Sequence, residues 1–144
     1  MSLTVDPVAD ALVVKSASVT LTSAQILAAN TKPVTIVPAP GAGSFILVLA
    51  SSYKVTFGTV AYSTGVAYGL YYGNASGQPA DNGAPGDPLA QSQSVLGFSG
   101  YGIADNAAAL ASFANQPVVF SAQGNPTLGD GTMTITAYYL IVSA

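Results

Sequence analysis

The chain has 144 residues, of which half are hydrophobic and only 6% are charged, and its formal net charge is −3. A chain of this length and apolar content forms one domain with its own core and does not stay disordered. Several chemistries are excluded: histidine and cysteine are absent, and three scattered lysines without arginine do not make the basic face that nucleic acid requires.

The N-terminal residues 1–11 are predicted to form an extended arm, and residues 12–144 a single β-sandwich domain. The first ten residues carry two acids and no basic segment, so we do not expect a secretory signal. No segment approaches the roughly 20 consecutive apolar residues of a membrane-spanning helix. The acidic balance also disfavours an anionic membrane surface, so we expect neither a membrane nor a nucleic-acid partner.

The first predicted elements are a strand and a short helix. Leu12–Leu21 alternates apolar and polar residues, which predicts a strand. Thr22–Asn30 begins with a capping box, in which Gln25 follows Thr22 by three residues, and this predicts a short helix. Pro33 prevents that helix from continuing.

A long strand, Ser44–Phe57, follows the short predicted strand Pro33–Val37 and a turn rich in proline and glycine. Its first half is apolar on both faces. Read at every second residue, Phe45 shares a face with Tyr53, and Ile46 and Val48 lie on the opposite face. Because one face of a sandwich sheet meets the core, Ile46 and Val48 then need cover from the arm, a short helix or another chain.

The second half of the chain is predicted to hold more strands, one loop and one helix. The strand Val66–Gly73 carries tyrosines on both faces, and the Gly-, Pro- and Asp-rich segment after it is a long surface loop. The further predicted elements are a strand within Leu89–Phe98, a short helix Asp105–Asn115, a strand Pro117–Gln123, a hairpin connection over Gly124–Gly131 and a strand Thr132–Val142.

Six to eight strands separated by turns predict an all-β fold, an antiparallel β-sandwich. Among sandwiches we expect a jelly-roll-like one, with the two short helices in connections. A parallel α/β fold is excluded because it needs longer helices between its strands.

Four segments carry a resemblance to a known family: Thr20–Asn30, Pro33–Gly43, Phe45–Leu49 and Phe57–Tyr62. Here the sequence resembles small structural proteins encoded in tailed-bacteriophage morphogenesis regions, over about the first half of the chain. The resemblance implies a non-enzymatic virion protein, a capsid decoration (cement) protein with a jelly-roll fold. Its partners would be the major capsid protein and itself, as a homodimer or homotrimer.

The implied location is the outer capsid surface of the virion, after assembly in the host bacterial cytoplasm. An alternative stays open, because members of this group also occur in tails or fibres. In that case the chain would be a tail- or fibre-associated module that binds a receptor or a glycan.

The residues themselves offer no catalytic constellation. Asp81–Asp87 contains oxygen ligands of the kind that Ca²⁺ prefers, but it lacks the spacing and the glutamate of a calcium loop, so a solvated loop is favoured. No pair of aspartates and no serine–lysine motif stands out. We therefore expect no enzyme, no metal and no cofactor.

The low charge suggests a surface that copies of the chain or a partner cover. Tyrosine is enriched at interfaces, although it also suits sandwich cores and sugar platforms. The predicted interface residues are Ile46, Val48, Tyr62, Tyr68, Tyr71, Tyr72 and Tyr101.

Overall fold

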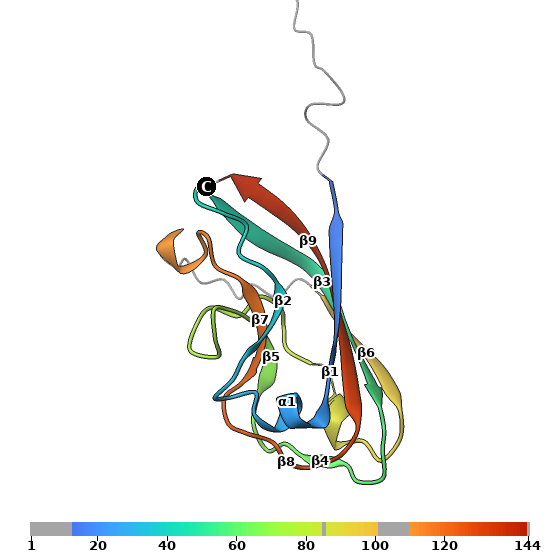
Figure 1. The fold of residues 1–144 in the computed structure, drawn as a ribbon. Coiled ribbons are helices and arrows are strands. Elements are labelled where there is room, and N and C mark those ends of the chain that lie inside the picture. The colour runs from blue at the N-terminus through green and yellow to red at the C-terminus, as the bar shows by residue number, and fades with distance from the viewer. Residues whose placement is uncertain (1–12, 85, 101–109, 144) are drawn as a thin grey trace, which may run out of the picture.

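A computed structural model describes residues 13–84, 86–100 and 110–143. It is an all-β sandwich, in which two sheets form separate layers and the short helix α1 lies with the β4–β8 pair at one end (Figure 1). The elements in chain order are β1 (Lys15–Leu21), α1 (Ser23–Leu27), β2 (Val34–Val37), β3 (Ser44–Thr56), β4 (Tyr62–Ser63), β5 (Tyr68–Tyr72), the 3-10 helix η1 (Pro88–Ala90), β6 (Val95–Gly100), the 3-10 helix η2 (Leu110–Ser112), β7 (Val118–Ala122), β8 (Thr127–Leu128) and β9 (Thr132–Ser143).

The connectivity between the sheets is that of a jelly roll. One sheet has the order β1-β9-β3-β6 and the other β2-β7-β5, and the pairings are antiparallel. Successive long strands therefore alternate between the layers. The segment after β5 returns along the outer edge of that strand, where Tyr71 and Pro79 form an antiparallel bridge. The prediction of an antiparallel, jelly-roll-like sandwich is confirmed.

The connections differ from the predictions in three places. The capping box of Thr22 and Gln25 is present, but α1 is shorter than the predicted helix. Only the end of the helix predicted over Asp105–Asn115 falls within the described residues, and there the chain makes the 3-10 turn η2. The predicted hairpin at Gly124–Gly131 is wrong, because β7 and β9 belong to different sheets and the segment crosses between them.

A β-bulge in β3 decides which residues face the core. The pairing of β3 with β9 shifts register between Val48 and Ala50, so Leu49 is an extra residue. Ile46 and Val48 therefore face the core together with Tyr53 and are almost completely buried. Strict alternation predicted that Ile46 and Val48 lie on the face opposite Tyr53. This prediction is wrong, because the inserted residue reverses the direction of every side chain that precedes it in β3.

The outward apolar face of this half of β3 thus belongs to Phe45 and Leu47. They pair with Val142 and Leu140 of β9, and paired residues share a face. Phe45, Leu47 and Val142 are partly buried, and Leu140 is 7% exposed. They form a small apolar cluster separate from the main core.

Candidate functional site

Six of the seven predicted interface residues are buried in the fold. Ile46, Val48, Tyr62, Tyr68 and Tyr72 belong to the main core cluster. Tyr71 faces the other side of β5 and is 8% exposed. A side chain that its own chain buries offers almost no area to a partner, so the structure corrects the interface assignment for these six residues. Tyr101 lies outside the described residues.

The buried tyrosines use their hydroxyl groups within the chain. Tyr72 donates to the carbonyl oxygen of Ile46 at 2.6 Å, and Tyr62 donates to that of Gly131 at 2.6 Å. Both bonds join segments that are distant in sequence. Burial raises the pKa of Tyr62 to about 12, and the nearby charge of Asp130 acts in the same direction. These tyrosines therefore stabilise the fold.

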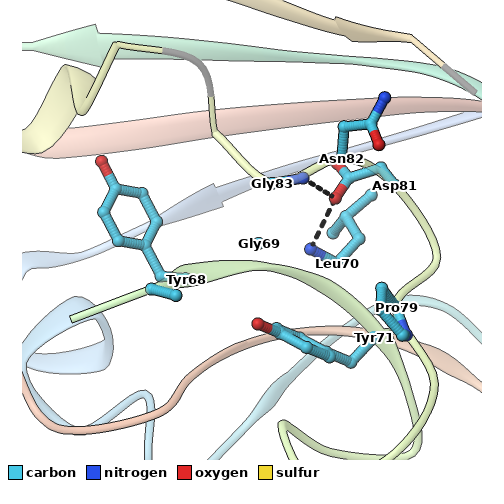
Figure 2. Close-up of a pocket in the computed structure, with 9 residues that line it drawn as sticks. Tyr68, Gly69, Leu70, Tyr71, Pro79, Asp81, Asn82 and Gly83 are labelled. Atoms are coloured by element: carbon cyan, nitrogen blue, oxygen red, sulfur yellow. Dashed lines mark hydrogen bonds between the residues drawn. The ribbon is translucent and has the colours of Figure 1, made fainter. Parts of the chain in front are cut away.

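The most elaborate polar cluster is centred on Asp81, which is 2% exposed. Its Oδ2 accepts hydrogen bonds from the Ser51 hydroxyl at 2.6 Å and from the Tyr53 hydroxyl. Its Oδ1 accepts from the backbone amides of Leu70 at 3.2 Å and Gly83 at 2.8 Å, the two bonds drawn in Figure 2. Ser51 and Tyr53 belong to one sheet and Leu70 to the other, so Asp81 links the two layers. We call these five residues the Asp81 clasp.

Two features hold the Asp81 clasp in place. A Cβ atom at Gly69 would lie 2.8 Å from the Cα of Gly83, so only glycine lets the segment around Asp81 approach β5 this closely. Burial raises the pKa of Tyr53 well above its ordinary value, and the adjacent Asp81 raises it further. Tyr53 therefore remains a proton donor to Asp81 at physiological pH.

A pocket of about 250 Å³ lies between β5 and the segment 79–83 (Figure 2). Its lining includes Tyr71, Pro79, Asp81 and Asn82. Each oxygen of the one carboxylate here already accepts two hydrogen bonds from the clasp. Both oxygens of the Asp81 carboxylate are therefore engaged in holding the segment 79–83 against β5, and neither is free to act as a base.

The other described aspartates have similar structural roles. Asp87 accepts from the hydroxyl groups of Thr64 and, at 2.7 Å, Tyr68. Asp130 accepts from the hydroxyl of Thr59 at 2.6 Å and from the amides of Val60 and Thr59 at 2.9 and 2.8 Å, and these bonds, that from the hydroxyl first, lower its pKa. The prediction that Asp81–Asp87 is a solvated loop is therefore wrong for Asp81. Its carboxylate is buried because it accepts hydrogen bonds from donors on both sheets.

The outer face of the four-stranded sheet is the surface with the most distinctive composition. It consists of the side chains that point away from the core in the paired register of the four strands. These residues are Ser16, Ser18 and Thr20 of β1, Thr134, Thr136 and Tyr138 of β9, Ala50, Ser52 and Lys54 of β3, and Leu96, Phe98 and Gly100 of β6. Lys54 is the single charged residue of this set.

Small hydroxyl residues form the centre of the outer face. Ser18 and Thr136 share a hydrogen bond of 2.9 Å, and Thr20 and Thr134 one of 2.8 Å. These two bonds satisfy hydroxyl groups within the face, across the pair of strands β1 and β9. Large exposed side chains flank it: Phe98 is 70% exposed, Leu96 55% and Tyr138 44%.

Sequence reasoning missed Leu96 and Phe98 as candidates. The available signal was the alternation in Val95–Gly100, where both large apolar residues share one face. The alternation alone does not say whether that face meets the core. The pairing with β3 answers this, because Leu96 lies opposite Lys54 and Phe98 opposite Ser52, both on the outward side.

Two kinds of site are absent from the part of the chain that the structure describes. It contains no group of three or more acidic, histidine or cysteine residues placed to hold a metal ion. Within the same residues, no helix is long and apolar enough to cross a membrane. Every buried side-chain nitrogen or oxygen recorded there has a hydrogen-bond partner.

Comparison with known proteins gives one distant structural likeness. No protein-family model and no curated protein sequence matches the chain. A solved structure described as a cyanophage Pam1 capsid asymmetric unit aligns with a TM-score of 0.45 and 14% sequence identity, over 90% of this chain and 84% of the other.

Proposed function

We propose that the chain is a non-enzymatic virion structural protein that decorates and stabilises a phage capsid by binding the major capsid protein and other copies of itself. The observation that carries the proposal is the outer face. It is rich in serine and threonine, bears the exposed Phe98, Leu96 and Tyr138, and carries one charged side chain. Depletion of charge together with exposed aromatic residues is typical of the centre of protein interfaces.

The size of the outer face accounts for part of such a contact. The face spans about six positions on each of four strands, and at about 16 Å² per strand residue it presents roughly 400 Å² before the relief of the side chains is counted. A standard interface takes about 800 Å² from each partner. The outer face would therefore supply about half of a standard contact with a capsid subunit, and neighbouring surfaces would supply the rest.

The roles of the acidic residues support the non-enzymatic part of the proposal. Asp81, Asp87 and Asp130 accept two or more hydrogen bonds each from their own chain. A catalytic carboxylate needs a free oxygen directed at a substrate. The described aspartates are instead committed to joining loops and sheets.

The alternative, a receptor- or glycan-binding module of a tail or fibre, receives less support. Such a module would place exposed tyrosines beside the Asp and Asn residues of a surface loop, here the segment after β5. Tyr68 and Tyr71 lie beside that loop but are 6% and 8% exposed, so neither offers a free ring for a sugar. A glycan array is the direct test, and specific glycan binding without particle binding would favour the alternative.

The proposal is tested by adding the purified chain to phage capsids that lack it and measuring co-sedimentation. We expect saturable binding, and Thr20→Glu, which puts a charge on the outer face, to weaken it about tenfold or more. Thr127→Glu is the matched control, since Thr127 is exposed on β8, away from this face, and should bind normally. Absence of binding by the unmodified chain, or equal binding by both variants, would contradict the proposal.

Salt dependence gives a second expectation for the same assay. Because the outer face has one charged residue, we expect capsid binding to change less than threefold between about 0.1 and 1 M salt, a range over which the screening length falls from about 10 to 3 Å. The measurement is retention on particles after washes of increasing ionic strength. Release at moderate salt would show that ionic contacts dominate and would exclude this face as the main contact.

A further inference from the structure

We infer that β6 is the self-association surface: two copies pair their β6 strands antiparallel across a twofold axis and join their four-stranded sheets into one. The inference deepens the proposed function, in which copies bind one another, by naming the edge that does so. It is also independent of the capsid, because the pairing needs only two copies of the chain.

Among the described residues, no strand pairs with the outer edge of β6. In the described residues β6 pairs with β3 alone, from Val95 to Gly100 and without a register shift. No other backbone hydrogen bond recorded for the described residues involves this strand. About half of the N–H and C=O groups of an antiparallel edge strand point away from its neighbour. Such a row of unpaired groups is a template for another strand.

This edge also lacks the devices that keep edges apart. The sequence of β6, Val95–Gly100, contains no charged residue and no proline. Two of the other edges differ: β1 begins with Lys15, and β5 is covered by its own loop. Two backbone hydrogen bonds join this loop to β5. The amide of Tyr72 donates to the carbonyl oxygen of Gln78 at 2.9 Å, and the amide of Ala80 donates to that of Leu70 at 2.8 Å. An edge strand without charge or proline can accept a partner strand.

The exposed side chains of β6 fit a second copy of the same strand. Leu96 and Phe98 project on one side of the sheet and are 55% and 70% exposed. In an antiparallel twofold pairing, the same two residues of the partner lie beside them on that side. Four apolar side chains then cover one another over the axis. An isologous contact of this kind needs no other surface.

Electrostatics permits this pairing. The nearest described lysine is Lys54, which lies opposite Leu96 on β3. Neighbouring strands are about 4.8 Å apart, so the two Lys54 residues would be separated by three strand spacings, about 14 Å or more. This exceeds the Debye length of about 8 Å at physiological ionic strength. The two copies therefore meet without significant repulsion between these lysines.

The size of the contact sets its strength. A phenylalanine buries about 150–250 Å² at most, and the strand has six residues. The total buried area thus stays below the roughly 1,200 Å² of a standard interface, in the range of weak association. We expect a dimer that forms at high concentration in solution and is reinforced where a particle surface holds copies close together.

Sedimentation velocity of the full chain without capsids, up to millimolar concentration, tests the inference. We expect a monomer–dimer equilibrium that Phe98→Lys shifts at least tenfold toward monomer. Tyr138→Lys is the matched control, since Tyr138 is exposed on the same face but on the central strand β9. The inference is overturned if the chain stays monomeric or if the dimer survives Phe98→Lys. It is also overturned if Tyr138→Lys abolishes the dimer, because the contact would then lie on the sheet face and not on the edge of β6.

Cysteine cross-linking gives an independent readout because the native chain has no cysteine. Leu96→Cys and Phe98→Cys are oxidised separately and as a mixture. Directly opposed residues of paired strands have Cα atoms about 4.5–5.5 Å apart, within the range for a disulfide. We expect one of the three combinations to cross-link much faster than Tyr138→Cys, and equal rates would refute the pairing. Neither assay contains capsids, so their failure is distinguishable from failure of capsid binding.

Discussion

Replacing Asp81 with alanine is expected to lower the free energy of unfolding by about 3–5 kcal/mol, because four hydrogen-bond donors lose one shared buried acceptor. Four donors, from Ser51, Tyr53, Leu70 and Gly83, lose their acceptor. Each buried donor left without a partner costs about 1–3 kcal/mol, and relaxation of the loop offsets part of that sum. Urea denaturation followed by circular dichroism measures the change.

A pair of neighbouring serines provides the control. Ser51 donates to Asp81 in the core, and Ser52 lies on the outer face of the same strand. We expect Ser51→Ala to cost about 1–2 kcal/mol and Ser52→Ala less than about 0.5 kcal/mol. If Asp81→Ala proves as mild as Ser52→Ala, the Asp81 clasp does not hold the two sheets together.

Stability is expected to fall steeply at alkaline pH. Burial is the first cause that raises the pKa values of Tyr53, Tyr62, Tyr68 and Tyr71 in the folded chain, that of Tyr62 to about 12. Unfolded tyrosines ionise near pH 10.0, so above this pH the unfolded state binds fewer protons than the folded state. The stabilisation is complete below pH 10 and is lost as the pH rises through the folded pKa values.

The slope of this loss approaches about 1.4 kcal/mol per pH unit for each deeply buried tyrosine. Urea midpoints between about pH 8 and 11 measure it, and near-ultraviolet absorbance follows the ionisation of tyrosine directly. We expect Tyr62→Phe to make the decline shallower. Ionisation of all tyrosines near pH 10 with the fold intact would contradict the assigned burial.

The interface residues show why the candidate site was harder to predict than the fold. Tyrosines and apolar strand residues suit cores and interfaces equally, and composition does not separate the two cases. The bulge at Leu49 then places Ile46 and Val48 in the core. Phe98 and Leu96, which the structure exposes, belong to a strand whose alternation was visible but whose orientation was not.

The sequence by itself determined the fold class and the positions of the elements. Alternation places strands close to β1, β3, β7 and β9, Thr22 and Gln25 mark the start of α1, and proline and glycine mark the turns. These signals are local, because they depend on backbone propensity and on residues two to four positions apart. The low content of charged residues, 6%, can likewise be read from the composition alone.

The tertiary structure alone decided which face of each strand is buried, which edge stays open and what the aspartates do. A bulge depends on the register with a strand some ninety residues away in the chain, as β3 with β9. Asp81 is buried because donors from both sheets converge on it, although its own segment has the composition of a surface loop. Such long-range pairings leave no pattern in a single sequence, because each partner is ordinary in its own local context.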